Sequence, residues 1–206
     1  MKNQKLLLKK MSGVSLMLLL FLFISNCASG DKIFSTDVWN ITYDDQQGGI
    51  ALTYKSKNIC NGMYASYQWE GKEIKTSDYA RHKISTGKVS DSFGKGHIYK
   101  VEYTDKELPK LTQYFYLYPG KEYILTDFTV EAKEEIRSGR MAPVNVDSIS
   151  GFLQAGDNRA LFVPFDNDKW NRYQSHPLGF DTLVSYEVTA IFNNESRNGL
   201  VIGSVE

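Results

Sequence analysis

The residue types best suited to ligand recognition are concentrated in one segment, Phe162–Tyr173. It leaves an apolar run and continues as a loop that mixes aromatic, carboxylate, amide and guanidinium groups. Aromatic faces stack on the apolar face of a sugar ring, while the polar groups hydrogen-bond its hydroxyls. Loops on a rigid scaffold often carry such sites. We therefore predict a carbohydrate-contacting site formed by Asp166, Asn167, Asp168, Trp170, Arg172 and Tyr173.

Other interpretations of the same segment remain open. Asp and Asn side chains build turns by bonding the nearby backbone, so the segment could be a turn with Trp170 and Tyr173 packed as core. A calcium loop of the EF-hand type needs Gly at its sixth position, where this chain has Asn171. Two carboxylates at Asp166 and Asp168 do not define the carboxyl separation that glycoside hydrolysis requires. We accordingly predict no catalytic residue, no metal and no cofactor.

Nucleophilic catalysis has few candidates elsewhere. The only cysteines are Cys27 and Cys60, and the only histidines are His82, His97 and His176. A catalytic cysteine needs a histidine brought close by the fold, and none of the three stands in a recognisable motif. We interpret Cys60 as a small apolar residue. Two cysteines also exclude a disulfide-dense scaffold and a four-cysteine zinc site.

The first 26 residues have the pattern of an export signal. Four lysines precede an 11-residue apolar run, Val14–Ile24, which is shorter than the roughly 20 residues that span a bilayer. The following Ile24–Cys27 segment resembles a bacterial lipoprotein signal, and this predicts lipidation of Cys27, a cell-envelope location and membrane contact through the lipid anchor only. The alternative is cleavage after Ala28 or Gly30, which would give a periplasmic or secreted protein.

The elements that must position the Phe162–Tyr173 segment are strands. Apolar and polar residues alternate with period two in Val38–Tyr43, Ile50–Tyr54, Met63–Trp69, Tyr99–Thr104, Tyr123–Val130 and Val184–Phe192. Leu161–Val163 is a continuous apolar run, which predicts a strand buried on both faces. Tyr118–Lys121 has Pro and Gly where a type II turn requires them. Ten to twelve short strands predict an all-β fold, a large antiparallel β-sandwich in one domain.

Composition sets the wider limits. The chain has 206 residues, of which 42% are hydrophobic, and 24 basic residues balance 24 acidic ones. The apolar content is enough for a core and argues against disorder. The zero net charge gives no basic footprint for nucleic acid. We expect a signal segment at 1–26, a tether at 27–34 and the β-sandwich domain at 35–206.

Four segments together resemble a known family: Met141–Val144, Phe162–Trp170, Ser185–Ala190 and Gly199–Glu206. They are similar to the N-terminal β-sandwich of exported bacterial α-galactosidase-like and raffinose-synthase-like glycoside hydrolases. The resemblance implies a sandwich that packs on a catalytic (β/α)₈ barrel and a loop that helps to close a galactoside pocket. It implies no catalytic residue in this chain, because the two catalytic aspartates of that family lie in the barrel.

The sequence therefore predicts the non-catalytic sandwich of an exported α-galactosidase-like hydrolase, with a galactoside-type oligosaccharide and a barrel as partners. Leu200–Glu206 resembles a strand that stops without a closing loop or polar tail, and we expect the front piece of a longer protein. The alternative is a chain that ends on an edge strand. The alternative function is a free-standing surface lipoprotein that binds glycan or a protein partner; a structural envelope protein is a third.

Overall fold

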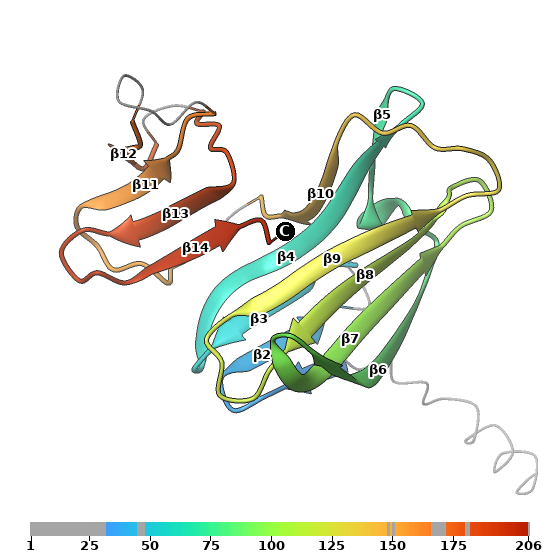
Figure 1. Ribbon diagram of the computed structural model, residues 1–206, viewed down its shortest axis with the longest axis horizontal. Helices are drawn as coiled ribbons and strands as arrows, with labels where there is room; N and C mark the ends of the chain where they lie inside the picture. Colours follow the sequence, from blue (N-terminus) through green and yellow to red (C-terminus); the bar gives the residue numbers. More distant parts are fainter. Residues whose placement is uncertain are drawn as a thin grey trace, which may run out of the picture.

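The computed structural model describes residues 32–44, 48–147, 149, 151–165, 172–179 and 182–205 (Figure 1). The described chain is all-β, as predicted: fourteen strands and one short 3₁₀-helix, η1 (Thr76–Asp78), form three antiparallel sheets. This is more strands than the ten to twelve expected. The signal segment and Cys27 lie outside the described residues.

The first sheet has six strands: five in the order β1-β2-β3-β4-β10, and β5, which pairs with the C-terminal part of β4. Their bounds are β1 Lys32–Ser35, β2 Trp39–Tyr43, β3 Ile50–Tyr54, β4 Lys57–Trp69, β5 Lys72–Lys75 and β10 Met141–Asn145. Because β1 begins at Lys32, the sheet includes three residues that we expected in the tether. Close backbone packing is visible at Gly49, where an added Cβ would lie 2.8 Å from the Cα of Gly62.

The second sheet is a four-stranded meander, β6-β7-β8-β9. Its strands are β6 Arg81–Asp91, β7 Gly94–Thr104, β8 Lys110–Leu117 and β9 Ile124–Glu131. The turn predicted after β8 is confirmed: Gly120 has a φ of 69°, and the Lys121 amide donates to the Tyr118 carbonyl at 3.0 Å. Glycine tolerates this left-handed conformation at the third position of a type II turn.

These two sheets form a sandwich around one apolar core. The predicted alternation places every second residue of a strand inward, as in β2, whose odd-numbered residues are buried and whose even-numbered ones are half-buried. Burial of a large aliphatic side chain contributes about 1.5–3 kcal/mol. The most completely buried apolar residues are Ile41, Ile50, Ala65, Val101 and Leu111.

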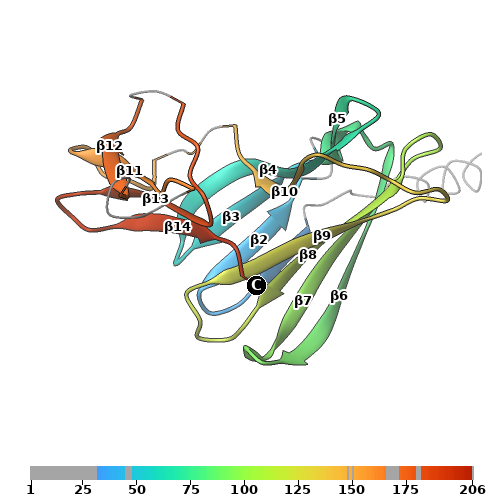
Figure 2. The same ribbon diagram turned by 45° about the horizontal axis from the view of Figure 1, so that its top comes forward.

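The third sheet has the order β12-β11-β13-β14 and lies beside the sandwich (Figures 1 and 2). Its strands are β11 Asn158–Phe162, β12 Gln174–Pro177, β13 Val188–Asn193 and β14 Gly199–Gly203. It reaches the sandwich core through Phe152, which precedes it, and Leu200 of β14. Within its strands the one fully buried residue is Asn193.

Two sequence predictions fail in this third sheet. The stripe Val184–Phe192 is a strand only from Val188, because Glu187 has a φ of 64° and interrupts the extended backbone. Val184 is 62% exposed. The run Leu161–Val163 is half-buried rather than buried on both faces, since the sheet is not enclosed between two layers.

Candidate functional site

The predicted carbohydrate site is described only at its edges. Asp166, Asn167, Asp168 and Trp170 lie outside the described residues. Arg172 and Tyr173 are described, directly before β12, and both are exposed; 65% of the Tyr173 surface is accessible. Tyr173 therefore does not pack as core, in contrast to the structural interpretation of this position.

The segment leaves β11 beside the chain that enters β13. The Ser185 hydroxyl accepts from the Val163 amide at 2.8 Å and donates to the Val188 carbonyl at 2.7 Å. The Tyr186 amide donates to the Val163 carbonyl at 2.9 Å. These bonds hold the start of the segment against the approach to β13, although residues 182–187 are outside any strand.

Exposed aromatic side chains gather at this end of the third sheet. Phe165 is 82% exposed, and its ring centroid lies 5.2 Å from that of Tyr186 in an edge-to-face arrangement. Tyr173 belongs to the same end, because the next residue, Gln174, pairs with Phe162 of β11. The exposed aromatic group Phe165, Tyr173 and Tyr186 thus lies at the described ends of the predicted segment and beside it. Rings that are accessible to water can stack on an apolar ligand face.

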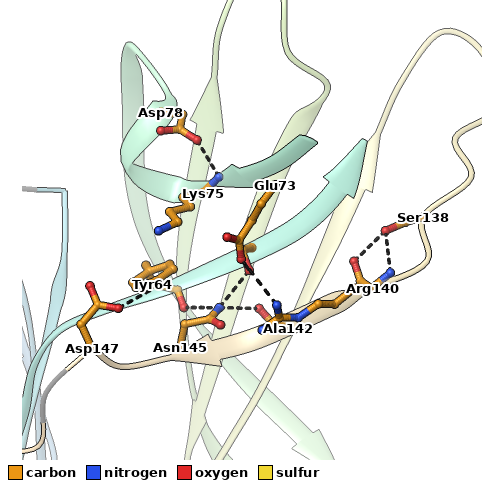
Figure 3. Close-up of polar contacts among 10 residues, drawn as sticks. Tyr64, Glu73, Lys75, Asp78, Ser138, Arg140, Ala142, Asn145 and Asp147 are labelled. Carbon is orange, nitrogen blue, oxygen red and sulfur yellow. Dashed lines mark hydrogen bonds and ion pairs between the residues drawn. The ribbon is translucent and has the colours of Figure 1, made fainter. Parts of the chain in front are cut away.

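A second polar cluster lies on the outer face of the first sheet, across β5, β4 and β10 (Figure 3). The Asn145 amide nitrogen donates to the Ser66 hydroxyl at 3.1 Å and lies within 3.4 Å of the Tyr64 and Ala142 carbonyls. The Ser66 hydroxyl donates to Glu73 at 2.9 Å. This chain of bonds crosses three strands.

The charged residues at the edge of this cluster also contact partners within the cluster. The Tyr64 hydroxyl donates to Asp147 at 3.0 Å, and the Lys75 ammonium lies 5.0 Å from the Tyr64 ring centroid. The contact with Tyr64 raises the pKa of Lys75. Arg140 lies 3.9 Å from Glu73. Since most donors and acceptors are satisfied within the cluster, we interpret it as the set of contacts that holds β10 against β4.

That fastening has a local cause. Pro143 interrupts β10, because proline has no amide hydrogen for the ladder, and the register with β4 shifts between Ala142 and Asn145. The Pro143 carbonyl instead accepts from the buried Gln113 side chain at 2.9 Å. β10 is thereby held from both faces, and it fixes where the chain leaves the sandwich for the third sheet.

The cysteine and the histidines of the described residues all pack against other side chains. Cys60 is buried, and burial raises the pKa of its thiol, which disfavours the thiolate a nucleophile needs. Each histidine packs on an aromatic ring at 4.6–6.3 Å: His82 on Tyr43, His97 on Phe34 and His176 on Phe162. Among the described residues no group of three His, Cys, Asp or Glu side chains could hold a metal ion.

Two shallow depressions on the surface of the described residues lie beside the segments that join the sandwich to the third sheet. One of about 470 Å³ lies at the junction of the sandwich and the third sheet and is lined by Lys57, Asn58, Gly151, Phe152 and Gln154. The other, of about 270 Å³, lies beside β10 and is lined by Tyr67, Val130, Ile136, Ser138 and Met141. Neither contains the paired carboxylates of a glycosidase.

The sequence singled out Phe162–Tyr173, which stays a prediction, and it gave no sign of Tyr186 as a neighbour or of the β5-β4-β10 cluster. Alternation does indicate that Tyr64 and Ser66 share the outward face of β4. Their partner Asn145 is about 80 residues away, so only the strand pairing brings them together.

No protein-family model, no curated protein and no solved structure matches this chain. No helix in the described part of the chain is long and apolar enough to cross a membrane.

Proposed function

We propose that this chain is the non-catalytic β-sandwich module of an exported α-galactosidase-like glycoside hydrolase, and that it contacts a galactoside-type oligosaccharide. The signal pattern at 1–26 supports export, with lipidation at Cys27 as the anchor. In this proposal the catalytic aspartates belong to a (β/α)₈ barrel, and the sandwich supports that barrel.

The observation that carries the proposal is the exposed aromatic group Phe165, Tyr173 and Tyr186 beside the predicted polar segment. An exposed aromatic pair contributes little to folding, and grouped exposed apolar side chains mark interaction sites. The neighbouring Arg172 and the predicted Asp166–Asp168 residues provide hydrogen-bond groups for sugar hydroxyls. Rings and polar groups together fit a carbohydrate better than a purely apolar ligand.

The exposed apolar side chains of the third sheet support the proposal that this chain packs on a barrel. Val201 and Ile202 of β14 are 68% and 44% exposed, and exposed apolar strands of this kind favour contact with a further protein surface. We propose that the barrel provides that surface.

Calorimetric titration of the purified protein with raffinose and stachyose tests the sugar contact. We expect measurable binding, weakened about 5- to 150-fold by Tyr186→Ala or Trp170→Ala, which corresponds to about 1–3 kcal/mol for loss of one stacking ring. Val201→Ala is the matched control, because it truncates an exposed side chain of the same sheet and keeps the aromatic group. Unchanged affinity in folded Tyr186→Ala and Trp170→Ala variants would contradict the sugar contact.

Incubation with p-nitrophenyl α-galactoside tests the non-catalytic assignment. We expect no turnover. Turnover that persists through repurification would contradict it, and Asp166 and Asp168 would then be the first residues to replace.

A further inference from the structure

The outer face of the second sheet carries a pair of tyrosines that the predicted site does not include. Tyr114 and Tyr116 are two residues apart on β8, so both point to the same face. Their ring centroids are 6.4 Å apart, and their planes lie within 21° of parallel. Both are half-buried, and the sheet turns this face away from the core (Figure 1).

Polar partners flank the two rings on both neighbouring strands. Tyr114 lies in register between Lys100 of β7 and Asp127 of β9. The Lys100 ammonium is 5.8 Å from the Tyr114 ring centroid, and the Tyr116 hydroxyl donates to Asp127 at 3.2 Å. Burial and the nearby Asp127 raise the pKa of Tyr116 to about 12, so its hydroxyl stays protonated and polar at neutral pH.

The adjoining strand β6 places two small residues, Ser85 and Gly87, on this face, with Lys83 and Val89 on either side of them. Gly87 pairs with Ile98, and Ser85 pairs with Lys100. Even a methyl group at Gly87 would come within 3.0 Å of the Ile98 side chain. Between the tyrosine pair and this stretch of β6, the face carries Ile98 and Lys100 of β7, which pair with Tyr116 and Tyr114.

The charges around the pair are mixed. Glu102 accepts from Lys100 and Lys110 at 3.2 Å each, and Lys110 also lies 3.6 Å from Glu131. With Lys83 of β6, which pairs with Glu102, and with Asp127, three cations and three carboxylates lie together on this surface. A strongly charged partner finds no complementary field here, whereas a neutral, hydroxyl-rich ligand finds both donors and acceptors next to aromatic rings.

We infer that Tyr114 and Tyr116, with Lys100 and Asp127, form a second carbohydrate-contacting surface that takes an extended neutral glycan across β7, β8 and β9. The inference rests on the proposed function for its ligand class but not on the Phe165–Tyr186 region. It assigns the sandwich itself a part in holding polysaccharide.

Affinity electrophoresis in native gels that contain galactomannan tests this surface. We expect the gel to retard the unsubstituted protein and Tyr114→Phe/Tyr116→Phe, because both keep the two rings. Tyr114→Ala/Tyr116→Ala should lose at least tenfold in affinity. Thr129→Ala, on the same outer face but outside the tyrosine rows, is the control and should behave as the unsubstituted protein.

The outcomes separate the two sites. Loss of retardation in the double alanine variant, with raffinose titration unchanged, supports the second surface. Equal retardation of the folded double alanine variant, with loss in Tyr186→Ala, overturns the second surface and leaves the proposed function standing. No retardation of the unsubstituted protein overturns the second surface, while the raffinose titration decides the proposed function separately.

Discussion

The sandwich and the third sheet use the same hydrogen-bonding pattern but differ in what covers them. In the sandwich, two sheets face each other, and inward residues such as Val101 and Leu111 have no accessible surface. In the third sheet the apolar residues of β11 and β13 are all half-buried, and Val201 is 68% exposed. Strand pairing alone makes a sheet, whereas burial between layers makes a core.

The two regions therefore differ in how they treat apolar surface. The sandwich has the burial that stabilises a fold, while the third sheet leaves aromatic and aliphatic side chains exposed. Its connection through β10 is held by Asn145 and Gln113, so the exposed sheet is placed by a well-bonded strand.

The largest expected effect compares equivalent leucines in the two regions. Leu111→Ala should lower the free energy of unfolding by about 2–5 kcal/mol, because it empties a fully buried site. Leu161→Ala in β11 should cost about 1 kcal/mol, since the side chain is already half in water. Urea unfolding of both variants measures the change in the free energy of unfolding. Equal losses in the two variants would contradict the difference in burial between the sandwich and the third sheet.

A smaller effect is expected where the two regions are joined. Asn145→Ala removes the bonds to Ser66 and to the Tyr64 carbonyl and should cost about 1–2 kcal/mol. Amide exchange in β10 should accelerate at the same time. Asn61→Ala, an exposed asparagine of β4 with one side-chain contact to Asn58, is the control and should stay within about 0.5 kcal/mol. If Asn145→Ala lowered the free energy of unfolding no more than the Asn61→Ala control does, this cluster would not hold β10 in place.

The smallest effect concerns pH. Hydrogen bonds from Lys110 and Lys100 lower the pKa of Glu102 below its ordinary value of 4.5. The carboxylate therefore stabilises the fold above pH 4.5, and this contribution is lost as the pH falls through the lowered pKa. Glu102→Gln should reduce stability by about 0.5 kcal/mol at pH 7 and by less at pH 3. Glu107→Gln, in the turn between β7 and β8, is the control, and a loss for Glu102→Gln that is independent of pH would contradict the assignment.

The sequence predicted strands best where one face is buried. Ile50–Tyr54 was correct to the residue and the run Val38–Tyr43 began one residue before β2, because the core imposes alternation on both strands. β6 was missed, since Arg81–Asp91 is mostly polar and is placed by its pairing with β7 along its whole length. Val184–Tyr186 alternates without forming a strand, because the backbone turns at Glu187.

The residues of the candidate sites could likewise be predicted only where they are neighbours in the sequence. The Phe165–Tyr173 neighbourhood is local in sequence and was predicted from its residue types. The partnership of Phe165 with Tyr186, and that of Tyr64 with Asn145, depends on which strands pair, and composition does not specify this. The alignment of Lys100, Tyr114 and Asp127 across three strands can likewise be predicted only when the register of the second sheet is known.

Native-state hydrogen exchange, read by mass spectrometry without denaturant, tests the central contrast most directly. We predict that amides of β7 and β8 exchange only through global unfolding, while those of β11 and β13 exchange at least a hundredfold faster through local opening. Exchange of all four strands at one common rate would contradict the account, because it would show that the third sheet belongs to the same cooperative core.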